Sequence, residues 1–193
     1  MDSLTHKSEI TGLILAGGAG CRVGRRDKGL IEWQKKPLVE HVLHRLGTQV
    51  GQLLISCNRN IPDYERYGVP TVLDTRTNFQ GPLAGLEAAS PAIETEFLIV
   101  VACDIPLLPL DLVPRLLAPL IAANADAPAL SYAHDGSRGQ YLCAAMRQRC
   151  LRSLTDYLEQ GHRTVHHWYN NQNVISVDFS DQKSAFTNFN KLQ

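Results

Sequence analysis

Four short apolar runs constrain this chain more than any other feature of its sequence. They cover residues 12–16, 52–57, 71–74 and 97–102, and glycine or polar residues bound them. Short runs that are apolar throughout are typical of strands buried on both faces, as in a parallel sheet between layers of helices. The run 97–102 is the most hydrophobic, so we expect it to be the central strand. The pattern predicts an α/β domain.

Helix-like segments separate these runs. Residues 38–47 follow Pro37 and carry apolar side chains at helical spacing, which predicts an amphipathic helix. Further helices are expected over 83–93, where Pro91 could interrupt the helix, and over 109–123, where Pro114 and Pro119 leave the ends uncertain.

The second half predicts an antiparallel addition to this sheet. Residues 129–132 and 141–146 flank a polar turn that contains Asp135 and Gly136, which is typical of two antiparallel strands. A helix is expected over 147–159, with Gly161 as its stop, and a late strand over 174–179. The expected fold is therefore α/β, with a mostly parallel central sheet and an antiparallel addition.

Charge and composition exclude several classes of partner. Nineteen Lys and Arg residues balance nineteen Asp and Glu residues, so nothing global attracts nucleic acid or an anionic membrane. No run approaches the roughly 20 apolar residues of a membrane span. Five cysteines without a C-x-x-C pair favour a reduced, cytoplasmic setting. We expect a disordered tail over 1–9 and a single domain, working as a monomer, over 10–193.

Two histidine pairs are candidate metal ligands. His41 and His44 fall on the predicted helix 38–47, and His166 and His167 are adjacent in the second half. Both pairs lack a cysteine or carboxylate partner at a spacing suited to zinc, so a metal role is not expected for them.

A glycine-rich loop follows the first apolar run and predicts an anion site. Glycines let backbone N–H groups approach a phosphate without a Cβ in the way. Four cations follow within seven residues, opposed by one acid; they are Arg22, Arg25, Arg26 and Lys28, with Asp27 as the acid. The spacing matches neither the dinucleotide fingerprint nor the P-loop. A flexible loop with a solvated basic face remains the alternative.

Carboxylates follow two of the other runs. Ligands of open parallel sheets bind at the carboxyl ends of the strands, which is where Asp74 and Asp104 fall. A carboxylate after the most buried run is costly unless it is paired or holds a cation, and Mg²⁺ commonly takes one or two carboxylates plus phosphate oxygens. As alternatives, Asp104 could cap the next helix, although Asp111 lies closer to it, and Asp74 could begin a turn.

Taken together, these motifs resemble those of the molybdenum cofactor guanylyltransferase family of nucleotidyltransferases. The resemblance runs from about residue 10 to the end of the chain. It rests on the order and spacing of L-A-G-G at 15–18, R-x-G at 22–24, D-K-G at 27–29, Q-G-P-L-A-G at 80–85, V-A-C-D-I-P at 101–106 and T-N-F-N at 187–190.

The resemblance implies a three-layer, Rossmann-like nucleotidyltransferase fold and an enzyme that moves GMP from GTP to molybdopterin cofactor, releasing pyrophosphate. It implies Mg²⁺ on Asp104, and Arg22, Lys28 and Asp104 as catalytic residues. The nucleotide-binding residues that it implies are Leu15, Ala16, Gly17, Lys28, Ser56, Asn58, Asp74, Gly81 and Asp104. Asn188 and Asn190 would hold the pterin substrate. Cofactor-inserting proteins and acceptor molybdoenzymes are the expected protein partners.

Departures from the family pattern leave two questions open. The family often has asparagine where an ungapped alignment places Ser56, and Asn58 follows two residues later on the same face of the strand, so either could serve. Relatives that use CTP usually read L-A-A-G in the first loop, whereas Gly17 stands here. Gln140 and Tyr141 stand where relatives usually have a proline.

Three rival functions remain: a cytidylyltransferase, a sugar-phosphate nucleotidyltransferase and a non-catalytic nucleotide sensor.

Overall fold

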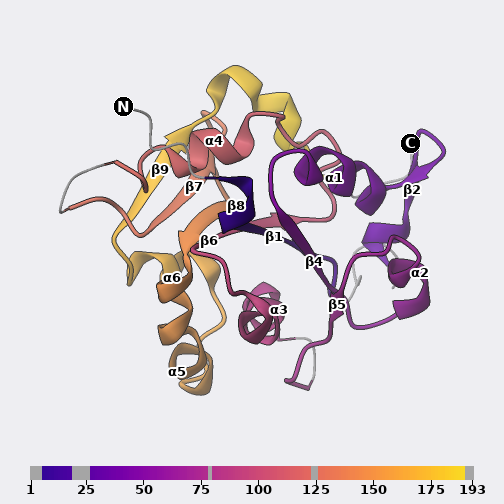
Figure 1. Ribbon diagram of the computed structural model, residues 1–193, viewed down its shortest axis with the longest axis horizontal. Helices are drawn as coiled ribbons and strands as arrows, with labels where there is room; N and C mark the ends of the chain where they lie inside the picture. The colour runs from indigo at the N-terminus through magenta and orange to yellow at the C-terminus, as the bar shows by residue number, and fades with distance from the viewer. Residues whose placement is uncertain (1–5, 19–26, 78–79, 123–125, 190–193) are drawn as a thin grey trace.

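A seven-stranded sheet forms the centre of the molecule in the computed structural model (Figure 1), which describes residues 6–18, 27–77, 80–122 and 126–189. The strand order is β5-β4-β1-β6-β8-β7-β9. Six strands run in one direction, and β8 runs antiparallel to both its neighbours. The strands are β1 (Ile10–Leu15), β4 (Gln52–Ser56), β5 (Thr71–Val72), β6 (Phe97–Ala102), β7 (Leu130–His134), β8 (Gly139–Arg147) and β9 (Val174–Asp178).

The predicted fold class is confirmed: helices cover both faces of a mostly parallel sheet. Helices α1 (Leu38–Gly47) and α4 (Leu112–Leu117) lie on one face. Helices α3 (Pro82–Ala89), α5 (Leu154–Glu159) and α6 (Val165–Asn170) lie on the other (Figure 1). The short helix α2 (Ile61–Glu65) sits between β4 and β5.

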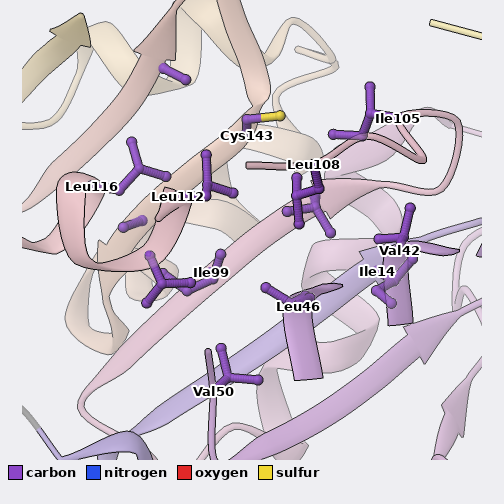
Figure 2. Packing of buried hydrophobic residues seen from close by; sticks show 14 of the residues in the cluster. Ile14, Val42, Leu46, Val50, Ile99, Ile105, Leu108, Leu112, Leu116 and Cys143 are labelled. Carbon is purple, nitrogen blue, oxygen red and sulfur yellow. The ribbon is translucent and has the colours of Figure 1, made fainter. Parts of the chain in front are cut away.

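Each face of the sheet has its own apolar core. Figure 2 shows the first, where Ile14 of β1 and Ile99 of β6 pack with Val42 and Leu46 of α1 and with Leu112 of α4. The second core joins α3, α5 and α6 to the opposite face, with Trp168 fully buried in it. Alternate side chains along each strand therefore pack against helices on opposite faces of the sheet, which explains why the strands are apolar throughout.

Three predicted helices are shorter than expected. The segment 109–123 yields α4 over six residues, because Pro114 can occupy only a first turn and Pro119 has no N–H with which to continue the helix. Pro91 converts the end of 83–93 to a 3₁₀ helix over Ser90–Ala92. Residues 147–159 divide into a 3₁₀ helix over Gln148–Ser153 and α5, and Gly161 follows at φ +85° as predicted.

Several short elements were not predicted. They include α2, α6, a 3₁₀ helix over Ser180–Phe186 and a small hairpin of β2 (Glu32–Trp33) and β3 (Lys36–Pro37). The hairpin turn places Gln34 and Lys35 at positive φ without a glycine, so the usual sequence signal is missing.

The beginning of the chain corrects one expectation. Residues Lys7–Glu9, assigned above to a disordered tail, form a 3₁₀ helix, and the Lys7 ammonium donates a hydrogen bond to the Thr48 carbonyl. Residues 1–5 lie outside the described part of the chain. Within that part, no helix combines the length and hydrophobicity that crossing a bilayer requires.

Candidate active site

One edge of the sheet contains a cavity of about 700 Å³. The carboxyl ends of β1, β4, β5 and β6 meet there. Because β8 is antiparallel, with Cys143 paired to Val101 near the end of β6, the first residues of β8 reach the same edge. The described lining residues come from the end of β1 and the loop after it, the end of β4, the beginning of α3, the end of β6 and the loop after it, and the beginnings of β8 and α6, together with Lys28, Asp74 and Asn188.

The loop after β1 is held by its neighbouring strands. The Ala16 amide donates to the Ser56 carbonyl at 2.8 Å, and the Cys103 amide donates to the Leu15 carbonyl at 3.2 Å. Leu15, Ala16 and Gly17 line the cavity, as expected of nucleotide-binding residues. The Gly17 carbonyl accepts a hydrogen bond from Asn58 at 3.2 Å, so this part of the loop is also fixed from β4.

The D-K-G segment places one cation in the site by anchoring its neighbours. The buried Asp27 carboxylate accepts hydrogen bonds from the Tyr64 hydroxyl at 2.6 Å, the Gly29 amide at 3.2 Å and the Asn60 side chain at 3.1 Å. A Cβ on Gly29 would lie 2.5 Å from the Tyr64 hydroxyl oxygen, so glycine is required there. Lys28 is therefore held with its ammonium at the cavity wall.

Lys28 forms an ion pair with Asp104, and both residues line the cavity. Lys28 Nζ lies 3.3 Å from Asp104 Oδ2, and the Asp104 side chain is 9% exposed. Asp104 does not begin a helix: the residue before α4 is Asp111, whose side chain makes no cap hydrogen bond. Asp104 therefore does not cap α4; its carboxylate lines the cavity and is paired there with Lys28.

Asp104 fits a magnesium ion that is shared with a substrate. Among the residues that the structure describes, no group of three or more His, Cys, Asp or Glu side chains could hold a metal. Mg²⁺ does not need such a cage, since it commonly takes one or two carboxylates and completes its shell with phosphate oxygens and water. One carboxylate beside a 700 Å³ cavity suits that mode of binding.

Asp74 and Asn58 form a reciprocal pair after β5 and β4. Asn58 Nδ2 donates to Asp74 Oδ2 at 2.8 Å, and the Asp74 amide donates to Asn58 Oδ1 at 2.8 Å. Asp74 Oδ1 is buried and has no hydrogen-bond partner among the described residues. Burial raises the pKa of Asp74, although the hydrogen bond from Asn58 acts in the opposite direction. Asp74 lines the cavity, as does Ser56, whereas Asn58 is not among the described lining residues.

Glycines let α3 approach the sheet at this edge. Gly81 lines the cavity and precedes α3 with φ +85°, a conformation that favours glycine. A Cβ on Gly85 would lie 2.4 Å from Ser56 Oγ, so α3 packs directly on β4 through this residue. The Q-G-P-L-A-G segment therefore shapes the cavity wall.

Two residues expected in the site, Arg22 and Asn190, lie outside the described residues. Asn188 is placed at the cavity as predicted. The next residue, Phe189, donates its amide to the Asp104 carbonyl at 2.9 Å, and its ring packs against Trp33 in a tilted arrangement with ring centroids 5.0 Å apart. These contacts bring the C-terminal segment to the loop after β6.

The far wall of the cavity was not predicted. It consists of the first residues of β8 and the beginning of α6, and its described members are Arg138, Gly139, Gln140, Tyr141, Leu142, Cys143, Thr164, Val165 and His166. The one signal for this wall in the sequence is that Gln140 and Tyr141 stand where relatives usually have a proline. The buried Asp135 fixes this wall, because it accepts hydrogen bonds from the Ser137 and Arg138 amides and, at 2.6 Å, from Gln140.

None of the described cysteines near this cavity is suited to nucleophilic thiol chemistry. Burial raises the pKa of the Cys57 thiol to about 11, and burial also raises the pKa of Cys103 and Cys143. Thiols that resist ionisation are poor nucleophiles.

His41 uses Nε2 to contact the Trp33 carbonyl at 2.9 Å, which is a structural role.

A parallel sheet whose carboxyl edge gathers a glycine-rich loop, a lysine and an acidic residue is typical of enzymes that bind nucleoside triphosphates. The profile of the MobA-like NTP transferase domain matches residues 12–174. The chain belongs to this family of nucleotidyltransferases.

Curated relatives agree with this assignment, and a solved structure shares the fold. The molybdenum cofactor guanylyltransferase of Shewanella halifaxensis is 39% identical over 95% of this chain and 90% of the relative. That of Shewanella piezotolerans is 40% identical over 94% of this chain and 87% of the relative. The crystal structure of molybdopterin-guanine dinucleotide biosynthesis protein A from Archaeoglobus fulgidus shares the fold, with a TM-score of 0.75 at 20% identity over 94% of this chain and 92% of the other.

Proposed function

We propose that this protein transfers GMP from GTP to molybdopterin cofactor and releases pyrophosphate. The observation that carries the proposal is the Lys28–Asp104 pair at the floor of the cavity, beside the first loop and Asp74. The curated relatives named molybdenum cofactor guanylyltransferase, 39% and 40% identical over nearly the whole chain, support the choice of substrates.

The reaction needs positioning and charge neutralisation more than proton transfer. A terminal phosphate oxygen of the pterin cofactor attacks the α-phosphorus of GTP and forms a new P–O bond. The bond between the α-phosphorus and its bridging oxygen to the β-phosphorus breaks, and pyrophosphate leaves with the electron pair. The attacking phosphate is already ionised at neutral pH, so no general base is required. The work of the protein is to hold two anions together, which is electrostatic catalysis.

The residues divide this work by position. Lys28 and Arg22 offset charge on the triphosphate, the backbone of Leu15, Ala16 and Gly17 receives the guanine base, and Ser56, Asp74 and Gly81 complete the nucleotide side. Asp104 would hold Mg²⁺, which when bound neutralises phosphate oxygens and polarises the α-phosphorus. Asn188, with Asn190, would hold the pterin. We place the reaction in the cytoplasm, with delivery of the product to cofactor-inserting proteins and molybdoenzymes.

The sheet order supports two substrates on opposite sides of Asp104. Strands β5, β4 and β1 lie on one side of β6, and β8 lies on the other. Residues of the first three strands form the nucleotide side, so the wall of β8, α6 and Asn188 is left for the acceptor. The attacking and leaving groups would then meet over the loop after β6.

The test is the Asp104→Asn variant, which keeps the shape of the side chain and removes its charge. We expect transfer of GMP to fall at least about a hundredfold, because loss of such charge stabilisation costs several kcal/mol in the transition state. Product formation is measured with Mg²⁺, pterin acceptor and GTP, CTP or ATP in turn, and wild-type protein with EDTA serves as a metal-free control. Near wild-type turnover of the variant would refute the metal assignment, and a wild-type preference for CTP would refute the choice of substrate.

A further inference from the structure

Two aromatic residues that the nucleotide side does not use meet at the far wall of the cavity. Tyr141 stands where relatives usually have a proline, and His166 belongs to the histidine pair for which no metal role is expected. Both residues line the cavity, and both are partly exposed. Their rings are in contact, with centroids 5.2 Å apart and an interplanar angle of 47°. Tyr141 and His166 thus form an aromatic corner in this wall.

A bulge in β8 brings the aromatic corner to the cavity. On β7, Tyr132 pairs with Ala144 of β8, but the next residue of β7 pairs with Gln140. Residues 141–143 are therefore left out of this ladder, and all of them line the cavity. Bulges redirect side chains and are common beside active sites. This one places a tyrosine ring against α6, at the edge of the sheet where the strands of the nucleotide side also end.

The bulge and the ring are held from behind. The buried Tyr169 of α6 donates a hydrogen bond from its hydroxyl to the Tyr141 carbonyl at 2.9 Å. The Tyr141 ring also contacts the ring of Tyr132, with centroids 4.9 Å apart. Gly139 leaves room for both rings, because a Cβ there would lie 2.9 Å from Tyr141 Cζ and 3.0 Å from Tyr132 Cε2. The ring is therefore in place before a ligand binds, which lowers the entropic cost of binding.

The chemistry of this wall suits a flat ring better than a chain of phosphates. Among its described lining residues, Arg138 alone carries a permanent charge, and the Arg138 side chain is 66% exposed. Aromatic side chains contact flat ligand rings in offset-stacked or edge-to-face arrangements. A heterocycle would gain such contacts at the aromatic corner, whereas a triphosphate would find few charges to neutralise it.

We infer that Tyr141 and His166 receive the pterin ring of the acceptor, which leaves its terminal phosphate for the Lys28–Asp104 pair. This inference rests on the proposed function, from which it takes the identity of the acceptor. Guanine is the other flat ring in the reaction, but the proposed function places it on the β1 side of β6, away from β8. Because relatives usually have a proline at the position of Tyr141, the ring contact is a specificity feature of this chain.

The experiment varies the acceptor at saturating GTP and measures the rate of GMP transfer. Tyr141→Leu should raise the KM for the acceptor about fivefold or more and leave kcat within about twofold, because the lost contact is made in the ground state and the transition state alike. Tyr141→Phe keeps a ring and should restore the KM to nearly the wild-type value. The GTP dissociation constant, measured by calorimetry, should not change in either variant.

The histidine pair provides a matched control. His166→Leu should raise the KM for the acceptor, because it removes one side of the aromatic corner. His167→Leu should not, since His167 is exposed and is not among the described lining residues. Equal effects of the two substitutions would overturn the role of His166.

A second route leaves Tyr141 in place and needs no turnover. Gly139→Ala should displace the Tyr141 ring, so it should weaken the binding of free pterin, followed by pterin fluorescence, as Tyr141→Leu does. This variant keeps the inference testable if the tyrosine variant does not fold. Unchanged pterin binding and acceptor KM in folded variants, or an equal loss of GTP affinity, would overturn the inference while the proposed function stands. A wild-type protein that transfers no GMP to the acceptor would overturn the proposed function, and the inference with it.

Discussion

At the scale of single residues, two neighbours in the D-K-G segment have different tasks. Asp27 is buried and receives three hydrogen bonds, whereas the Lys28 side chain is 27% exposed and reaches the cavity. In the sequence, Lys28 is conspicuous for its charge, whereas Asp27 is only the acid that opposes the cluster of cations. The structure shows that the aspartate fixes the segment through Tyr64.

Substitution of these neighbours should separate stability from activity. Asp27→Ala should lower the free energy of unfolding by about 3 kcal/mol, because the buried Tyr64 hydroxyl and the Gly29 amide lose their acceptor. Lys28→Ala should cost less than about 1 kcal/mol, as substitutions of partly exposed residues usually do, while GTP binding weakens sharply. Urea denaturation and GTP titration of both variants provide the test. A large stability loss in the lysine variant with intact GTP binding would make Lys28 structural.

The buried carboxyl of Asp74 predicts a pH dependence. Burial, followed by the charge of Glu87, raises its pKa, against the hydrogen bond from Asn58. The unfolded chain therefore ionises this group first, so its contribution to stability is present at low pH and is lost as pH rises through the folded pKa. Relative to wild type, Asp74→Asn should become more stable as pH rises from about 4 to 7. Thermal melts of both proteins across that range test this, and a difference that moves the opposite way would contradict it.

At the scale of elements, the contact of α3 with β4 sets one wall of the cavity. Gly85 allows the helix to lie against Ser56 and Leu15, and the short apolar pattern of the helix does not reveal this. The same limitation applies to α4, whose length depends on proline positions, and to the β2–β3 hairpin, whose turn has no glycine. Elements with strong periodicity, such as α1 over 38–47, were predicted to the residue.

Gly85→Ala should therefore destabilise the protein although alanine favours helices. The added Cβ would lie 2.4 Å from Ser56 Oγ and 3.2 Å from Leu15 Cδ2, and overpacking of this kind costs about 1–3 kcal/mol. The intrinsic helix preference would return at most about 1 kcal/mol. Gly18→Ala is the matched control for stability, since its Cβ would meet nothing within 4 Å. Equal melting temperatures for the two variants would show that α3 can shift freely.

At the scale of the whole molecule, the site combines segments that are far apart in the sequence. The Phe189 amide donates to the Asp104 carbonyl, and the Phe189 ring packs at a tilt against Trp33. Trp33 itself contacts His41 of α1, with ring centroids 4.9 Å apart. The C-terminal segment that carries Asn188 is thus fixed to the first half of the chain.

Loss of the Phe189–Trp33 ring contact should affect one substrate more than the other. An aromatic pair contributes about 0.5–1.5 kcal/mol, so Phe189→Ala should raise the KM for the pterin acceptor by up to about tenfold. The dissociation constant of GTP should remain within about twofold, and Phe189→Leu should give an intermediate effect. Steady-state kinetics with each substrate varied in turn make the measurement. Equal changes for GTP and acceptor would mean that the segment supports the whole site.

The parallel half of the molecule and the residues gathered at its carboxyl edge could be predicted because each strand there ends at or near a recognisable residue. Leu15 and Asp74 lie at the ends of apolar runs and Asp104 lies two residues beyond one, and parallel strands bring such ends to one edge. The wall formed by β8 and α6, which we propose for the acceptor, could not be predicted in this way. It depends on the reversed direction of β8 and on Asp135, whose hydrogen bonds to Gln140 and Arg138 arise only when the turn has formed.

The position of β6 has a consequence for synthesis on the ribosome. This strand pairs with β1 on one side and with β8 on the other, and β8 is translated later than every strand on the β1 side of the sheet. Domains begin to fold from the part that emerges first. Until β8 leaves the exit tunnel, the most hydrophobic strand of the protein therefore has an open edge, which is a template for pairing with other chains. Nascent chains from which β8 has not yet emerged are the species that we expect chaperones to bind.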